Sequence, residues 1–190
     1  MSWLPLVAVI TLIVTLFWRA WWQRRRYGSR GVLLFRSGRR QETLREALGV
    51  ALLLLLAAQA LLVDQPAYPA GRASGAALMF GGIAFLVAAQ LNLGASWRIG
   101  IERGSSPGLV TAGFYRFCRN PIFLALLIFL AGYALLLPTL LSLLMLVGAF
   151  IGIRQQVLEE EAYLAGTYGD AYREYASRVG RFVPGIGKLH

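Results

Sequence analysis

The sequence predicts an all-α protein, an integral membrane bundle of about five transmembrane helices that forms a single membrane domain over residues 1–190. Of the 190 residues, 57% are hydrophobic and 15% are charged, and the mean hydropathy is +0.59. This composition is too apolar for a soluble domain of this size. The hydrophobic residues form continuous runs, each able to enter a bilayer, at 3–18, 47–63, 75–93, 122–137 and 140–153.

The first run, 3–18, is expected to remain in the protein as a helix. It ends in FWRAWWQRRR, in which tryptophans suit the membrane interface and arginines stop translocation. It lacks the basic leading region and the small-residue cleavage site of a secretory signal peptide. The run therefore predicts a retained transmembrane helix.

Glycines within the apolar runs are expected to let neighbouring helices approach closely. Small residues serve this purpose in membranes because no side chain holds the two backbones apart. These glycines are Gly81, Gly82, Gly132, Gly148 and Gly152.

The last two runs are short for a bilayer. The 16 residues of the fourth run cover about 24 Å, against a hydrocarbon core of about 30 Å. Local thinning of the bilayer or a tight helical hairpin would accommodate them. Pro121 suits the first turn of the fourth helix and biases Asn120 away from helical angles, so we expect Asn120 at the N-cap.

The net charge of +10 predicts topology rather than nucleic-acid binding. Of the nineteen Lys and Arg residues, eighteen lie on one side of a five-helix scheme, in 19–45, in 94–120 and from Arg154 onward, whereas Arg72 lies on the other. Such an excess marks the cytoplasmic side, which places the amino terminus outside. We expect a bacterial inner (plasma) membrane protein whose basic ends contact anionic lipid, with no nucleic-acid partner.

Two polar segments on the basic side, 94–120 and 154–190, are expected to build any site for a water-soluble cofactor. The tail predicts a helix from Gln155 to about Tyr168, a stop at Gly169 and a second short helix from Asp170.

Glu161 is the most unusual residue of the tail helix. Its spacing places it on one face with Val157, Leu164, Ala165 and Tyr168, in the middle of an apolar stripe. An ionised carboxylate there costs several kcal/mol unless cations or donors satisfy it. We therefore expect Glu161 and its neighbour Glu160 to belong to a functional site. The candidate partners of Glu161 are Arg154, Arg119 and a cationic ligand, whereas Glu159 is expected to face solvent.

Arg116 and Arg119 precede the fourth helix, where the helix dipole disfavours cations unless an anion binds. They mark topology or, with the first amides of the helix, they form a site for a carboxylate or phosphate. The single cysteine, Cys118, excludes an internal disulfide and a cysteine-based metal cluster. The single histidine, His190, is the last residue, so we expect neither a catalytic histidine nor a metal site.

Two segments, LVTAGFYRFCRNPIF and EEEAYLAGTYGDAYREYASRVGRFVP, resemble the integral membrane methyltransferases related to isoprenylcysteine carboxyl methyltransferase and phospholipid N-methyltransferase. The resemblance covers residues 91–184, whereas the earlier part is similar only in being hydrophobic. We therefore expect N-terminal helices over 1–90 and a methyltransferase-like core over 91–190.

The family pattern is Leu-Val-x-x-Gly-x-Tyr and Arg-His-Pro, then paired glutamates, a leucine, Phe/Tyr-Gly and a later Tyr-x-x-Tyr. Asn120 replaces the histidine, which removes a titratable group but leaves a neutral donor and acceptor. The first group of matching residues is Leu109, Val110, Gly113, Tyr115, Arg119, Asn120 and Pro121. The second is Glu160, Glu161, Leu164, Tyr168, Gly169, Tyr172 and Tyr175.

The resemblance implies a methyltransferase that binds S-adenosyl-L-methionine at the cytoplasmic face and acts on a lipophilic small-molecule or lipid-linked acceptor. Arg119 and Asn120 suit the cofactor carboxylate, whereas Glu160 and Glu161 suit its cationic groups. As catalytic residues we expect Arg154, which would position an anionic acceptor, and Glu161. The expected cofactor-binding residues are Leu109, Val110, Gly113, Tyr115, Arg119, Asn120, Pro121, Glu160, Glu161 and Tyr172.

Two other functions fit the sequence. The asparagine at position 120 is compatible with a non-catalytic lipid-binding or scaffold protein. Membrane sterol-type reductases, which use NADPH, look similar in their carboxy-terminal part. The acceptor itself stays open among carboxylates, amines, phenols and thiols, because an apolar tunnel discriminates weakly between similar shapes.

Overall fold

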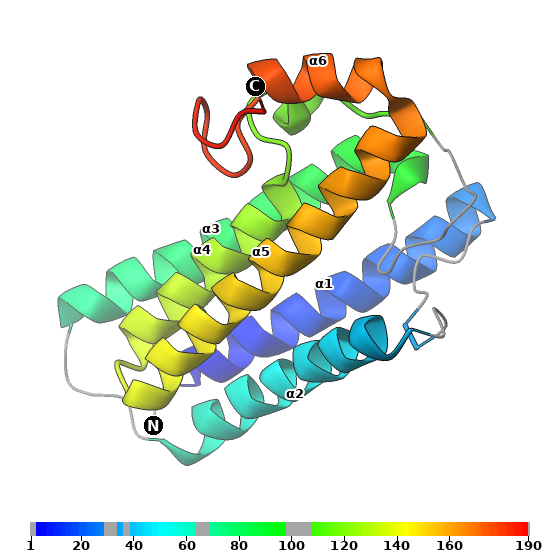
Figure 1. Cartoon of the computed structure of the whole chain (residues 1–190). Coiled ribbons are helices and arrows are strands. Elements are labelled where there is room, and N and C mark those ends of the chain that lie inside the picture. Colours follow the sequence, from blue (N-terminus) through cyan, green and yellow to red (C-terminus); the bar gives the residue numbers. More distant parts are fainter. Residues whose placement is uncertain (1–2, 29–33, 36–38, 64–68, 98–107, 190) are drawn as a thin grey trace.

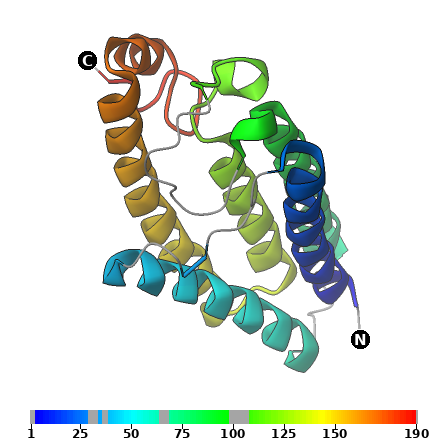
Figure 2. The ribbon, with the colours of Figure 1, turned by 90° about the vertical axis from the view of Figure 1, so that its right-hand side faces the viewer.

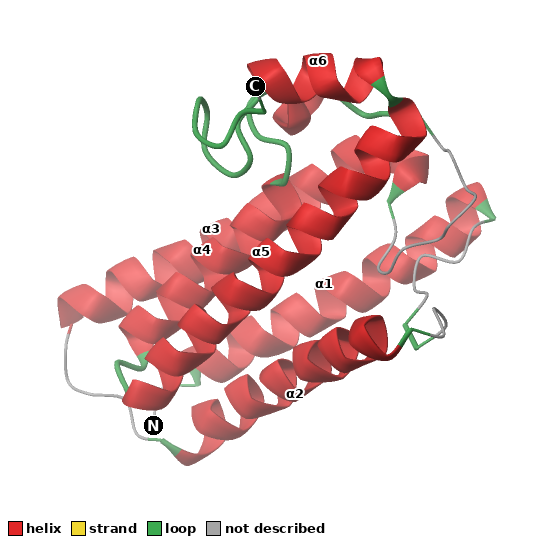
Figure 3. Cartoon of the chain, in the orientation of Figure 1, coloured by secondary structure: helices red, strands yellow, loops and turns green. Residues whose placement is uncertain are grey.

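A computed structural model describes residues 3–28, 34–35, 39–63, 69–97 and 108–189 of the chain. Within these residues every regular element is a helix, and the only β-type pairing is an isolated bridge between Cys118 and Gly180 (Figure 3). The all-α prediction is confirmed. The elements in order are α1 (Leu4–Tyr27), α2 (Arg40–Leu62), α3 (Pro69–Leu93), η1 (Gly94–Ser96), η2 (Gly113–Arg116), α4 (Pro121–Leu136), α5 (Leu140–Tyr168) and α6 (Asp170–Arg178).

Four of the helices, α1, α2, α3 and α5, are long and apolar enough to cross a membrane, and α4 is a shorter apolar helix. This agrees with a membrane bundle of about five helices. Only Leu137–Thr139 separate α4 from α5, so the two short runs form a tight hairpin (Figure 1). The hydroxyl of Thr139 accepts from the Ser142 amide and caps α5.

The helices extend beyond the apolar runs that predicted them. α1 continues to Tyr27 through three arginines in its last turn, and α2 starts at Arg40 rather than at 47. Arginine and glutamine are good helix formers, so these helices continue past the apolar segment. The residues from Gln155 to Tyr168 are helical as predicted, and they form the last part of α5, which runs unbroken for 29 residues, about 44 Å at the helical rise. Gly169, with φ +54°, ends it as predicted.

The helix ends that carry the basic residues lie together. We call the place where α1, α3 and α5 end and α2 and α4 begin the basic end of the bundle. Arg19 near the end of α1 donates to the carbonyls of Gln90 and Gly94 at 3.3 and 2.8 Å, and its guanidinium lies 4.7 Å from the Trp97 ring centre. Figure 1 shows α6 lying across this end.

α3 and α4 pack most closely, and glycine makes this contact possible. A Cβ added to Gly132 would lie 2.6 Å from the Gly75 carbonyl oxygen, and one added to Gly82 would lie 2.9 Å from the Phe129 amide. The packing role predicted for Gly82 and Gly132 is confirmed. For Gly81, Gly148 and Gly152 it is wrong, since nothing lies within 4 Å of their added Cβ atoms.

α2 lies at the edge of the bundle (Figure 2). Near its carboxyl end, Gln59 donates to Ser142 of α5 at 2.9 Å. Near its amino end, Arg45 forms a bidentate ion pair with Glu159 of α5, at 2.5 and 2.7 Å. Polar contacts thus join α2 to α5 at both ends.

Candidate functional site: a buried ion cluster at the basic end

The chain before α4 and the chain after α6 lie side by side. The Arg119 amide donates to the Gly180 carbonyl at 3.0 Å, and the Asn120 amide donates to the Arg181 carbonyl at 3.2 Å. Gly180 has no room for a side chain, because the Val183 and Ile186 carbonyls occupy the position of a Cβ. The described parts of the two predicted polar segments therefore form one unit, whereas residues 98–107 and His190 lie outside the described residues.

Glu161 lies between two arginines in this unit. Its Oε1 accepts from the Arg119 Nη2 at 2.9 Å, and its Oε2 accepts from the Arg181 Nη2 at 2.9 Å. The Glu161 and Arg119 side chains are only 7% and 2% exposed, and Arg181 is 21% exposed. We call Arg119, Glu161 and Arg181 the ion cluster. Arg119 was a predicted partner of Glu161, whereas Arg154 is exposed on α5 and does not join the cluster.

Backbone carbonyls satisfy the remaining donors of Arg119. Its Nη1 donates to Ala176 and Val179 at 2.9 and 2.6 Å, and its Nη2 donates to Gly187 at 3.0 Å. Ala176 lies in the last turn of α6 and Val179 is its C-cap, so both carbonyls are at the helix end where the dipole favours a cation. A buried charge is tolerated when it is paired and fully hydrogen-bonded in this way.

The ion cluster carries a net positive charge, because two guanidinium groups face one carboxylate. The hydrogen bonds that Arg181 donates to Glu161 raise the pKa of Arg181 above its ordinary value, so this arginine stays charged. The amino end of α4, which starts at Pro121 directly after Asn120, adds the partial positive charge of a helix start. The electrostatics of this site therefore favour an anion.

Asn120 occupies the predicted N-cap position of α4, but its side chain does not cap the helix. The Nδ2 instead donates to the Arg181 carbonyl at 3.2 Å and lies 3.5 Å from the Glu161 Oε1. Asn120 is therefore a member of the polar site, and Pro121 follows it as the first, buried residue of the helix.

Three buried tyrosines pack beside the ion cluster. The Tyr175 hydroxyl donates to the Tyr115 carbonyl at 2.6 Å, which fixes α6 against the segment before α4. The Tyr172 side chain is 1% exposed, and its hydroxyl has no hydrogen-bond partner among the described residues. Burial, followed by the charge of Glu161, raises the pKa of Tyr172, so the phenol is neutral. Such a hydroxyl is a donor without an acceptor, next to a positively charged cluster.

The predicted residues upstream of α4 differ in their surroundings. Leu109 packs against the buried cluster of Tyr172, Tyr175 and Ala176, and Val110 is half-buried. Gly113 has φ +61°, and a Cβ there would collide with the Asn92 side chain, whose oxygen accepts from the Phe114 amide at 2.8 Å. A larger residue at position 113 would displace the Asn92 side chain and break this hydrogen bond to the end of α3.

The remaining charged residues lie around the cluster. Glu160 is half-buried, and burial of Tyr115, followed by the charge of Glu160, raises the pKa of the Tyr115 phenol. Glu159 is exposed as predicted and pairs with Arg45. The Arg116 guanidinium is exposed and stacks 4.4 Å from the Phe117 ring centre, so only Arg119 of the two arginines enters the cluster. Burial raises the pKa of the Cys118 thiol to about 11.

Arg181 was not among the predicted site residues. It lies in a loop after α6, so the spacing of residues along a helix could not predict where its side chain points. The sequence indicated only that it is one of the basic residues of the tail. The available signal was the segment VGRFVPGIG, whose glycines and proline predict a chain reversal that returns a lone arginine toward the bundle.

Comparison with known proteins agrees with the resemblance in the sequence. The model of the family described as phospholipid methyltransferase matches residues 70–171, which include Arg119, Asn120 and Glu161. The chain is also 32% identical over 84 residues to a protein-S-isoprenylcysteine O-methyltransferase of Schizosaccharomyces pombe. This match covers 44% of the chain and 36% of that relative. The predicted resemblance is confirmed, and this chain belongs to the phospholipid methyltransferase family.

Proposed function

We propose that this protein is a membrane methyltransferase that uses S-adenosyl-L-methionine and methylates a lipophilic or lipid-linked acceptor. The observation that carries the proposal is the buried, net positive ion cluster, which joins the two segments that resemble the family. Arg119 and Glu161 are buried there, and burial of two charged side chains is costly unless the pair serves a purpose.

The described residues suit this cofactor. Its carboxylate is an anion of the size that a net positive cluster at a helix start binds. The unpartnered Tyr172 hydroxyl supplies a neutral donor, and Leu109, Val110 and Tyr115 offer apolar and aromatic surface for an adenine ring. When bound, the cofactor supplies an activated methyl group on a sulfonium centre.

We assign different parts to the two glutamates. Glu161 already accepts hydrogen bonds from both arginines, so we infer that it holds Arg119 and Arg181 in position rather than contacting the sulfonium. Glu160, half-buried beside the tyrosines, remains the candidate for the cationic part of the cofactor. Gly113 and Pro121 fix the backbone on either side of Arg119 and Asn120.

The chain's own residues then orient the acceptor and manage its proton. Methyl transfer needs no covalent nucleophile, so the protein chiefly positions the reactants. An acceptor carboxylate is already ionised, whereas an amine or thiol must lose a proton, for which Glu160 is the nearby carboxylate. Arg154, exposed on α5, is the proposed contact for an anionic acceptor group.

The names of the family and of the relative suggest two acceptor classes, a phospholipid headgroup amine and an isoprenylcysteine carboxylate. The basic end faces the cytoplasm in this proposal, as the positive-inside rule indicates, and a bacterial inner membrane remains the expected location.

Binding calorimetry on the purified protein in detergent tests the cofactor. We expect S-adenosyl-L-methionine to bind with a dissociation constant of the order of micromolar. Arg119→Lys should weaken binding by about tenfold, because lysine cannot make all the hydrogen bonds by which Arg119 holds Glu161 and three backbone carbonyls, so the cluster loses its geometry. Arg116→Lys, at the exposed neighbouring arginine, is the matched control and should bind normally. Binding of NADPH instead would indicate a reductase, and binding of neither would indicate a lipid-binding or scaffold protein.

A transfer assay identifies the acceptor. The protein is incubated with methyl-labelled cofactor and a total membrane lipid extract, and the labelled product is separated by class. Label in a headgroup amine or in a prenylated cysteine ester would select between the two acceptor classes. Absence of label in any lipid-soluble product would contradict a lipophilic acceptor.

A further inference from the structure

The last described segment, residues 180–189, forms a loop that returns from α6 toward the start of α4 (Figure 1). We call it the return loop. It is fixed at both ends, by the bonds of Gly180 and Arg181 with Arg119 and Asn120 and by the Leu189 amide, which donates to the Ala176 carbonyl at 3.0 Å. It also supplies Arg181 and the Gly187 carbonyl to the ion cluster.

The tip of the return loop exposes apolar side chains. The Ile186 amide donates to the Val183 carbonyl at 3.1 Å and closes a tight turn, with Gly185 and Gly187 at φ +81° and +75°. Within this turn, Ile186 is 68% exposed and Val183 is 47% exposed, and Pro184 between them is also exposed. An ordered turn that directs a branched aliphatic side chain outward loses free energy in water.

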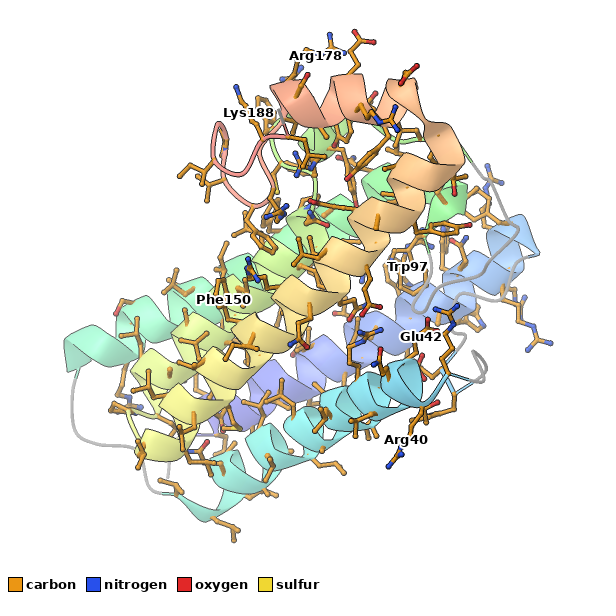
Figure 4. All side chains as sticks on the ribbon, viewed as in Figure 1. Arg40, Glu42, Trp97, Phe150, Arg178 and Lys188 are labelled. Carbon is orange, nitrogen blue, oxygen red and sulfur yellow. The ribbon has the colours of Figure 1, made fainter. Side chains whose placement is uncertain are left out.

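Basic residues flank this apolar tip. Lys188 follows it and is exposed, and Arg181 precedes it with part of its guanidinium accessible. Figure 4 shows Lys188 on the return loop, at the same end of the molecule as Arg178. The described loop carries no acidic residue. An apolar tip with a positive rim is the chemistry of a segment that binds the boundary between anionic headgroups and acyl chains.

We propose that the tip of the return loop, Val183–Ile186, docks into the anionic headgroup–acyl boundary of the leaflet at the basic end. The backbone bonds to Arg119 and Asn120 hold the loop beside the first turn of α4, where a membrane-spanning hairpin enters the bilayer. Lipid is therefore the apolar phase nearest to the tip. Because the same loop supplies Arg181 to Glu161, docking links lipid composition to the geometry of the ion cluster.

Nitroxide accessibility measures the docking without relying on activity. The full chain in a Cys118→Ala background, reconstituted in nanodiscs of equal parts phosphatidylcholine and phosphatidylglycerol, carries a label at Ile186→Cys. Ser177→Cys, on the exposed face of α6, is the matched control. We expect the ratio of oxygen to nickel-chelate collisions to be about threefold or more higher at position 186 than at 177. Equal ratios at the two positions would overturn the proposal.

Lipid composition and protein density provide the remaining comparisons. Removal of phosphatidylglycerol should lower the ratio at position 186, and Lys188→Gln should reduce this dependence. If the collision ratio at position 186 is the same with and without phosphatidylglycerol, the proposed preference for anionic headgroups is overturned. Spin–spin broadening at 186 that grows with protein density would instead assign the tip to a second copy of the chain, which would also overturn it. Failure of cofactor binding leaves these outcomes unchanged, so the proposal stands apart from methyl transfer.

Discussion

The α3–α4 interface and the ion cluster stabilise the fold in opposite ways. At the interface, Gly75, Gly82 and Gly132 let two backbones meet with no side chain between them. At the cluster, three long charged side chains from α5 and from the loops before α4 and after α6 fill the space. Apolar side chains gain little from contacting each other instead of lipid, so close backbone contact joins helices inside the membrane. The interface should therefore fail when atoms are added, and the cluster when atoms are removed.

The largest effect is expected for Glu161→Ala. The change leaves Arg119 buried without a carboxylate, and loss of one partner of a buried pair costs about 3–5 kcal/mol. We expect the free energy of unfolding in mixed detergent micelles to fall by this amount. Glu161→Gln keeps an acceptor for one arginine, so its free energy of unfolding should decrease by less. Equal stability of wild type and Glu161→Ala would mean that the cluster does not hold these loops together.

Gly132→Ala is expected to have the next largest effect on stability. The added methyl group would lie 2.6 Å from the Gly75 oxygen and 2.7 Å from the Met79 nitrogen, both backbone atoms that cannot rotate away. Overpacking of this kind costs about 1–3 kcal/mol. The measurement is the same unfolding titration.

Gly148→Ala is the control for this prediction, since nothing lies within 4 Å of its added Cβ. There the better helix propensity of alanine should leave stability unchanged or raise it by about 0.5–1 kcal/mol. If both variants lost the same free energy of unfolding, the cause would be a change within the helix rather than overpacking at the interface.

Local sequence patterns predicted the membrane helices well. The fourth run, 122–137, differs by one residue from α4, because a proline fixes its start and a second proline follows its end. Hydropathy alone misplaced the ends of α1 and α2, since charged residues that favour helix extend both. It also could not tell Gly132 from Gly148, because each glycine lies in an apolar run and only the partner helix distinguishes them.

The candidate site was predicted where a helix face or a motif fixed the residue. The apolar stripe around Glu161 indicated a buried carboxylate, and the motif before α4 indicated Arg119. Arg181 was missed because its position depends on how the return loop closes, which is a tertiary property. Arg154 shares a helix face with Glu161, yet it lies two turns before the cluster and stays exposed.

Tyr172→Phe, next to the ion cluster, tests ligand binding separately from stability. The hydroxyl has no partner in the described residues, so its removal should leave stability unchanged or slightly raised. If the hydroxyl donates to the cofactor, affinity should fall by about five- to tenfold, the value of one hydrogen bond. Calorimetry with S-adenosyl-L-methionine measures this. Tyr175→Phe loses the hydrogen bond to the Tyr115 carbonyl, so it should lower stability and leave the affinity for the cofactor unchanged. Unchanged affinity in Tyr172→Phe would remove this hydroxyl from the cofactor site.

The smallest effect is expected for Glu159→Gln, which breaks an ion pair whose distances are as short as those of the cluster. Glu159 is 44% exposed and Arg45 is 19% exposed. Water can therefore solvate the two charges when the ion pair is broken. Exposed pairs contribute about 0.2–1 kcal/mol, and salt screens them. We expect an unfolding free energy within this range of wild type at low salt, and a difference that disappears at high salt. A loss as large as that of Glu161→Ala, and insensitive to salt, would mean that α2 is held to α5 chiefly by this one pair, and that burial is not what distinguishes the two carboxylates.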